Sequence, residues 1–253
     1  MHAAGIYTHD GGAENTLFDY AISSYCSTPQ DLLGSLRPVS ETDSFAMVAI
    51  IEPEGIPGRA GPLPNTITEL AHIRAHIPHK DKLIEHIGSQ KTSSSTTKIL
   101  DDLKQASIVH FGCHGQQSQH NPLESCLLLS DGALTISRII REGNGKPGDT
   151  VRLAYLNACQ TATGDEKRPD EGLTLAASMM FAGFKSVIGT MWSIHDADAP
   201  VVADVFYRYI FRNGTGSPAA AKDAAKGLHL AVAELRSRGR PLRNWVPFIH
   251  FGV

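Results

Sequence analysis

The sequence predicts an α/β fold in which a mostly parallel sheet is covered by helices on both faces. Short, nearly continuous apolar runs such as 45–51 are bounded by polar or turn residues, which is typical of buried parallel strands. Segments with helical spacing of apolar residues separate these runs, and this alternation favours parallel strands joined by helices. A length of 253 residues with 42% hydrophobic residues allows a sizeable core.

The first strand and helix of the pattern are predicted from the region that begins at residue 45. The run 45–51 contains no polar residue, so it is expected to be buried on both faces. A loop rich in proline and glycine follows. Asn65 is then expected to cap a helix that includes Ile73 among its apolar positions and ends before Pro78.

Two more strands, a helix and a hairpin are predicted in the middle of the chain. The run 82–87 is a weaker strand candidate, and 108–113 is apolar enough for a buried strand. Between them, three apolar residues at 99–103 have helical spacing. Residues 126–134 are predicted to form a hairpin that turns at Asp131-Gly132, a dipeptide that suits a tight turn.

The same alternation continues to the C-terminus. Gly143 is expected to stop a short helix that begins at Ser137, and 172–184 is predicted to be a helix rich in alanine and methionine. The remaining elements are predicted as strands at 151–158, 185–192 and 245–251 and as helices at 197–211 and 219–238.

Residues 1–43 are predicted to be a partly helical N-terminal extension or linker, and residues 44–253 to form the main domain. The first segment lacks the alternation of strands and helices that begins near residue 45. A helix at 13–25 and a helical turn at 31–36 are the elements expected in it.

Composition and charge argue against two classes of protein. A net charge of −3 without a Lys/Arg block is unlike a nucleic-acid binder, which normally has a basic face. The longest nearly apolar stretch, 173–184, is too short to cross a bilayer, and the N-terminus lacks the pattern of a signal peptide. The four cysteines are sparse and unevenly spaced, which favours free thiols in a reducing compartment. A cytoplasmic protein with no membrane or nucleic-acid partner is therefore expected.

Two short blocks, VHFGCHG at 109–115 and YLNACQT at 155–161, carry the chemistry. Each is an apolar strand that ends in a reactive side chain, His114 in the first block and Cys159 in the second. Active sites of parallel sheets gather at the carboxyl ends of the strands. Alternation along the first strand directs Cys113 into packing and leaves His114 at the strand's end.

This pair of side chains is suited to acyl transfer. A thiol attacks a carbonyl group efficiently only as the thiolate, so Cys159 needs a base, and His114 can accept its proton and later protonate the leaving amine. The oxyanion of the tetrahedral intermediate needs hydrogen-bond donors. The backbone N–H groups of Gly115 and Cys159 are the candidates for this oxyanion hole.

Four blocks of the chain together resemble those of one protein family. They are HFGCHG, NACQTATG, GLTLAASMMFAGFKSVIGTMW and the C-terminal WVPFIHFG. Over roughly residues 44–253 the chain resembles the CHAT branch of the caspase–separase clan of cysteine proteases, most closely the CHAT domains of fungal multidomain proteins. Caspases similarly place their histidine about 50 residues before the cysteine block.

The resemblance implies a caspase-like three-layer sandwich with His114 as the base and Cys159 as the nucleophile. It also implies that the strand ending near Trp192 presents an edge to which an extended peptide can pair. Met191, Trp192 and Ser193 would then line the substrate groove. The leading hypothesis is a cysteine endopeptidase that cleaves a protein or peptide substrate.

The position two residues before the nucleophile bears on specificity. Many Arg/Lys-specific relatives carry Asp there and caspases carry Gln, whereas this chain has Asn157, which is expected to line a neutral part of the P1 pocket. A preference for a basic P1 residue would need an acid from a loop. The loop candidates are Asp165, Asp170, Glu171, Asp196 and Asp198, of which the last two could equally be N-caps of the next helix.

The alternative hypothesis is a catalytically silent or gated interaction module of the same fold. Members of the clan are commonly gated by partner domains, so regulatory domains or proteins outside this chain are expected. A third option is another thiol acyl-transfer enzyme, such as an amidase.

No cofactor or metal is predicted. His72 and His76 are four residues apart on a predicted helix, but there is no H-E-x-x-H motif and no acidic third ligand nearby in the sequence. A solvated helix face is therefore expected there. Cys113 and His114 lack a second Cys/His pair with zinc-ligand spacing. The glycines within 143–148 precede a strand, so they match a dinucleotide fingerprint by letters only.

Overall fold

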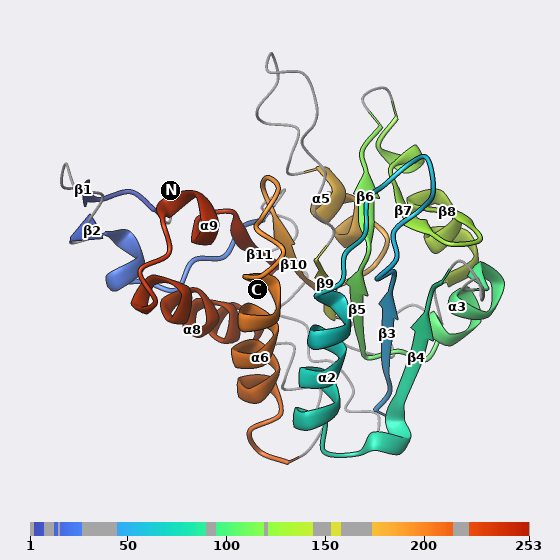
Figure 1. Ribbon diagram of the computed structural model, residues 1–253, viewed down its shortest axis with the longest axis horizontal. Coiled ribbons are helices and arrows are strands. Elements are labelled where there is room, and N and C mark those ends of the chain that lie inside the picture. The colour runs from blue at the N-terminus through green and yellow to red at the C-terminus, as the bar shows by residue number, and fades with distance from the viewer. Residues whose placement is uncertain are drawn as a thin grey trace.

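The structure is a three-layer sandwich built around a six-stranded central sheet (Figure 1). It is a computed structural model, and it describes residues 3–7, 13–14, 16–26, 45–89, 95–118, 121–143, 153–157, 174–214 and 223–252. In these ranges no helix combines the length and the apolar character needed to cross a membrane.

The central sheet is parallel except for the strand at one edge, β11, which runs antiparallel to its neighbour. Two of the inner strands, β3 and β5, are buried at every position, which explains their nearly continuous apolar sequences. From one edge to the other the order is β11 (Phe248–Gly252), β10 (Ser186–Thr190), β9 (Leu153–Leu156), β5 (Ile108–Gly112), β3 (Met47–Ile51) and β4 (Leu83–Ile87).

One face of the sheet is covered by α2 (Thr66–His76), α6 (Ala199–Ile210) and α8 (Ala224–Ser237). Ile73 of α2 and Phe206 of α6 are fully buried in the same cluster as the alternate strand residues of this face. Each such side chain contributes about 2 kcal/mol through burial.

The opposite face carries the second core cluster, beneath shorter helices and a small antiparallel sheet. This layer contains α3 (Thr96–Leu103), α4 (Ile136–Arg138) continued by a π-helical turn (Ile139–Gly143), and α5 (Thr174–Phe181). The small sheet consists of β6 (His114–Gln116), β7 (Cys126–Leu129) and β8 (Gly132–Thr135). Helices on both faces confirm the predicted three-layer α/β fold.

Most predicted elements have a counterpart whose ends differ by a few residues. The β7–β8 hairpin turns at Asp131-Gly132 as predicted, with Gly132 at a φ of 147°. The strand expected at 245–251 begins later, because Trp245 ends a short helix, α9 (Leu242–Trp245), in which its side chain is buried against Phe18.

The helix expected at 13–25 is wrong. Ala13–Glu14 (β2) instead pairs with Ile6–Tyr7 (β1), and only a 3₁₀ turn forms at Leu17–Asp19. Phe18 is the one large apolar side chain of this segment that is buried, while Tyr20 and others are exposed. The apolar residues of 17–25 have helical spacing, but the backbone of Tyr25 instead pairs with β11, donating to the carbonyl of His250 and accepting from the N–H of Gly252. A short helix is marginal on its own, so this tertiary pairing decides the conformation. The helical turn expected at 31–36 lies outside the described residues.

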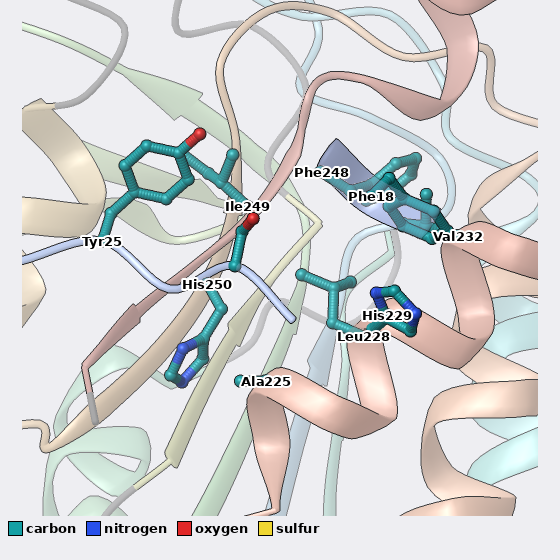
Figure 2. A pocket seen from close by; sticks show the side chains of 10 residues that line it. Phe18, Tyr25, Ala225, Leu228, His229, Val232, Phe248, Ile249 and His250 are labelled. Atoms are coloured by element: carbon teal, nitrogen blue, oxygen red, sulfur yellow. The ribbon is translucent and has the colours of Figure 1, made fainter. Parts of the chain in front are cut away.

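The segment 16–26 packs on the edge of the domain formed by α8 and β11. Tyr25 forms a parallel bridge with Phe251, and its backbone N–H donates to the carbonyl of His250 (2.8 Å). Phe18 stacks on His229 of α8 with ring centroids 4.1 Å apart. Figure 2 shows the small pocket that remains between this segment, α8 and β11. The outer edge of β11 is therefore covered around Tyr25. Whether residues 1–43 form a separate unit stays a prediction.

His250 is held in one tautomer beneath this segment. The Ser24 hydroxyl donates its proton to the carbonyl of Gly252 (2.5 Å), so at the 2.7 Å contact with His250 it accepts from Nδ1–H. Nε2 of His250 then accepts from the Ser186 hydroxyl (2.8 Å). Burial lowers the pKa of His250 to about 4. The ring is therefore neutral over most of the pH range in which the protein is folded.

The neutral His250 predicts a loss of stability in acid. Between pH 6.5 and about 4 the unfolded chain binds a proton at this position and the folded protein does not, so the free energy of unfolding falls as the pH falls. The contribution lost is about 3 kcal/mol. Chemical denaturation of wild type and His250→Asn at pH 7, 5.5 and 4 measures it, with the exposed His79→Asn as control. Equal pH slopes for wild type and His250→Asn would contradict the assignment.

Candidate active site

The two sequence blocks lie on neighbouring parallel strands, β5 and β9. In their register Phe111 is opposite Leu156, and the backbone N–H of Asn157 donates to the carbonyl of Phe111 (2.9 Å). His114 and Cys159 each come three residues after one of these paired residues in the sequence. Since paired strands are about 4.8 Å apart, β5 and β9 end side by side at the carboxyl edge of the sheet.

His114 begins β6, where the chain passes from the central sheet into the small sheet. The side chain is buried, and Nε2–H donates to the carbonyl of Gly61 (2.8 Å). Because a carbonyl group only accepts, Nε2 carries the proton and the neutral ring has its lone pair on Nδ1. Nδ1 is therefore the nitrogen that can act as a base. The next residue, Gly115, is buried in β6 opposite Leu127.

The carbonyl of Gly61 belongs to the loop between β3 and α2, and this loop is tied both to itself and to β6. The backbone N–H of Leu63 donates to the carbonyl of Pro53 (2.9 Å). Arg59 Nη2 donates to Gln116 Oε1 (3.2 Å) across to the strand that carries the histidine. These contacts orient the carbonyl that selects the imidazole tautomer.

A buried carboxyl group ties the small sheet to the central sheet. Glu52 follows β3 directly, and its Oε1 accepts from the backbone N–H (2.9 Å) and the hydroxyl (3.2 Å) of Ser130 in the β7–β8 turn. A Cβ at Gly88 would lie 1.8 Å from Glu52 Oε2, so only glycine fits there without displacing the carboxyl group. The contact positions the hairpin against which β6 pairs.

Cys113, the neighbour of His114, is a core residue, as the alternation predicted. It is fully buried in the cluster that contains Phe111. Burial raises the pKa of the Cys113 thiol well above its ordinary value, and the nearby Glu52 and Cys126 add to the effect. A thiol that stays protonated is a poor nucleophile.

A buried polar cluster behind this edge joins four elements of the fold. Asn157, just after β9, donates from Nδ2 to Glu69 Oε1 on α2 (2.6 Å). His110 Nε2 on β5 lies 3.3 Å from Glu69 Oε2, and His110 Nδ1 lies 3.0 Å from the hydroxyl of Tyr207 on α6. Each of these side chains is buried. The side chain of Asn157, expected in a P1 pocket, is thus directed into this cluster.

Sequence reasoning missed Glu69, His110 and Tyr207. The available signal was Glu69, which lies on the buried face of its helix with Thr66 and Ile73, three residues before and four after it. A carboxyl group on an apolar face requires a partner. The partners themselves are distant in the sequence, so their identity needed the fold.

Strand β10, where a substrate edge is expected near Trp192, is paired on both sides over its first part. Over Ser186–Thr190 the strand pairs with β11, and over Ser186–Ile188 also with β9. The backbone N–H of Met191 donates to the carbonyl of Pro247 (2.9 Å), so hydrogen bonding on the side of β10 that faces β11 continues one residue beyond the strand. The C-terminal strand thus covers one side of β10 throughout, and β9 covers the other side as far as Ile188. The edge expected near Trp192 stays a prediction.

The residues that follow β10 lie at the surface near α9. Trp192 is 37% exposed, and its Nε1–H donates to the carbonyl of Arg243 (3.0 Å), which fixes the direction of the indole. Ser193 is exposed, while Met191 is half-buried and packs against the second core cluster. A role for these three residues in substrate binding stays a prediction.

Two acidic residues of the loop before α6 have structural partners. Asp198 is fully buried and accepts from Arg240 Nε (2.6 Å) and Asn244 Nδ2 (2.5 Å). Asp196 Oδ2 accepts from Asn65 Nδ2 (2.5 Å). Asn65, expected to cap α2, makes no side-chain cap, because its backbone is itself helical (φ −71°, ψ −11°) instead of extended. Asp198 is therefore unavailable to a basic P1 side chain.

The described residues contain the base but not the nucleophile of the predicted dyad. Cys159 lies outside them, as do the loop candidates for P1 recognition Asp165, Asp170 and Glu171.

The family model of the CHAT domain matches residues 3–253 of this chain. The chain belongs to the CHAT domain family. The match includes residues N-terminal to the predicted boundary at residue 43. A search of the curated proteins found no match.

Solved structures similar to this CHAT domain are cysteine proteases. The Arg-specific cysteine proteinase gingipain R superposes with a TM-score of 0.51 and 14% identity, over 82% of this chain and 46% of that one. A complex of Porphyromonas gingivalis RgpB pro- and mature domains has a TM-score of 0.48 at 14% identity, over 82% and 47%. A secreted C11 cysteine protease from Bacteroides thetaiotaomicron, with an irreversible peptide inhibitor, has a TM-score of 0.43 at 11% identity, over 76% and 60%. This chain spans about half the length of gingipain R, and the similarity establishes the fold alone.

The buried cluster predicts that Asn157 stabilises the end of β9. In Asn157→Ala the carboxyl group of Glu69 loses its 2.6 Å donor, and we expect the free energy of unfolding to fall by about 3 kcal/mol. In a Glu69→Gln background the same change should cost only about 1 kcal/mol, because a neutral amide is less costly to leave unpaired. Chemical denaturation of the wild type, Asn157→Ala, Glu69→Gln and the double variant completes this double-mutant cycle. An equal loss in both backgrounds would mean that Asn157 acts through its volume alone.

Proposed function

We propose that this CHAT domain is a cysteine endopeptidase in which His114 is the base and Cys159 the nucleophile. The main support is the hydrogen bond from His114 Nε2–H to the carbonyl of Gly61, which places the lone pair of the neutral ring on Nδ1. The register of β5 and β9 is the second support, since both sequence blocks leave the sheet at one edge. The protease fold of gingipain R is the third.

The proposed reaction follows the chemistry of thiol acyl transfer. The Sγ proton of Cys159 passes to Nδ1 of His114, the sulfur bonds to the peptide carbonyl carbon, and the carbonyl oxygen becomes an oxyanion. The N–H groups of Gly115 and Cys159 are the proposed oxyanion donors. His114 then protonates the leaving amine as the C–N bond breaks. Water attacks the thioester, its proton returns through His114, and the new carboxyl group leaves the regenerated thiol.

The carbonyl of Gly61 is proposed to have a second role, beyond orienting the imidazole. Protonation at Nδ1 leaves the Nε2–H···O bond intact and places a positive charge 2.8 Å from a carbonyl oxygen. Hydrogen bonds from a charged donor are roughly twice as strong as neutral ones. The carbonyl of Gly61 is therefore proposed to stabilise the imidazolium that forms when Cys159 is deprotonated, in addition to orienting the ring.

Substrate recognition is proposed to involve the residues beyond β10, chiefly Trp192 and Ser193. The backbone of β10 pairs on both sides only as far as Ile188, so an extended peptide is proposed to pair beyond that residue, on the side away from β11. Asn157 is proposed to position the strand end instead of contacting P1. With Asp198 buried beneath Arg240, the half-buried Asp196 is the described acid that remains as a candidate at the pocket.

Regulation by domains or proteins outside this chain is part of the proposal, because members of the clan that the chain resembles are commonly gated by partner domains. A thiol-reactive peptide probe separates an active from a silent module. Labelling of Cys159 in the isolated chain supports the peptidase. Labelling that needs a partner indicates a gated enzyme, and none under either condition indicates a silent interaction module.

Removing either member of the dyad should abolish peptidase activity. We expect Cys159→Ala and His114→Ala each to lower kcat/KM by at least about 10³-fold on a peptide selected from a substrate library, because the nucleophile or its base is missing. The matched control Cys113→Ala removes a buried thiol and should keep activity wherever the protein folds. Full activity of Cys159→Ala would exclude the mechanism.

The dyad also predicts a pH dependence of the rate. Activity requires one proton shared between Cys159 and His114, so kcat/KM should rise and then fall between about pH 5 and 9, with apparent pKa values that belong to the pair. Initial rates across this range test it. A flat profile in the wild type would argue against a coupled pair.

A further inference from the structure

A cluster of two histidines and one aspartate lies where α2 and α6 pack together. His72 Nδ1 and His76 Nε2 of α2 lie 3.2 Å and 2.6 Å from Asp204 Oδ1 of α6. The three atoms are all within 4.8 Å of one another. The sequence around His72 and His76 offered no acidic ligand, and the structure supplies one that is 128 residues from His76.

We propose that His72, His76 and Asp204 form a binding site for Zn²⁺. Zinc takes nitrogen and carboxylate ligands at about 2.0–2.2 Å, so neighbouring donors of a tetrahedral site are about 3.3 Å apart. The separations here fit this value after small rotations of the side chains. Two imidazoles and one carboxylate leave a fourth position for water. Ca²⁺ and Mg²⁺ prefer all-oxygen ligands and do not suit this set.

The surroundings of the site leave an open path to solvent. The three ligand side chains are between 21% and 34% exposed. Metal can therefore reach the donors without unfolding the helix pair.

Arg208 is the group that opposes a cation here. Its Nη1 lies 3.8 Å from Asp204 Oδ2, the oxygen that does not face the histidines. The side chain is 61% exposed, so it can move into solvent when the metal binds. The positive charge of Arg208 nevertheless lowers the affinity of the site for a dication, and removing this charge should raise the affinity.

Zinc at this position would join two helices of the same layer. Glu69 lies one helical turn before His72 on α2, and Asp204 lies one turn before Tyr207 on α6, so the metal site and the buried cluster connect the same pair of helices. Binding to the folded state alone stabilises it by mass action. This inference does not depend on the proposed peptidase activity.

Titration of the metal-free full chain with Zn²⁺, followed by calorimetry, tests the site. We expect one ion per chain with micromolar affinity, weakened by at least about tenfold in His72→Ala, His76→Ala and Asp204→Asn. The exposed His79→Ala and the proposed nucleophile variant Cys159→Ala should bind as the wild type does. Arg208→Gln should bind more tightly. Mg²⁺ and Ca²⁺ should give no heat of binding.

Thermal melting and Co²⁺ spectroscopy test the assignment of the ligands independently of calorimetry. A saturating excess of Zn²⁺ should raise the melting temperature of the wild type by about 5 °C and that of the three ligand variants by much less. Melting in chelator checks that these variants fold. Co²⁺ should give visible d–d bands without a thiolate charge-transfer band. Unchanged Zn²⁺ affinity in the ligand variants, or a thiolate band lost in Cys159→Ala, would overturn the assignment.

Discussion

The structure depends on the contacts of the buried carboxyl group of Glu69. It receives the amide of Asn157 at the end of β9 and faces His110 of β5, which in turn contacts Tyr207 of α6. One polar side chain on α2 thereby links two central strands and a second helix. A buried carboxyl group without partners costs several kcal/mol, so these elements are held in one arrangement. That arrangement sets where β5 and β9 end.

The carboxyl edge of the sheet is organised by contacts that act on backbone groups. Glu52 holds the β7–β8 turn through Ser130, and the loop after β3 presents the carbonyl of Gly61 to His114. The described contact that orients the imidazole is thus to a main-chain carbonyl. This edge holds the proposed base His114, while the proposed nucleophile Cys159 is assigned from its sequence block alone.

The sequence predicted the fold well where local pattern and tertiary environment agree. Strands buried on both faces, such as β3 and β5, must be apolar throughout, and the Asp131-Gly132 turn suits a hairpin wherever it occurs. Expectations failed where distant segments compete. Asn65 makes no side-chain cap because its backbone is drawn into the helical conformation, and its amide donates instead to the distant Asp196. The segment 13–25 is not helical because β2 pairs with β1 and Tyr25 pairs with β11.

By itself, the sequence determined the alternation of strands and helices, the packing of Cys113, and the two blocks that mark His114 and Cys159, because these follow from local periodicity and residue chemistry. Only the tertiary structure decided which nitrogen of His114 carries the proton, where the amide of Asn157 points, and that Asp204 meets His72 and His76. Each of these is a contact between residues at least 53 positions apart, and such contacts exist only after the chain has folded.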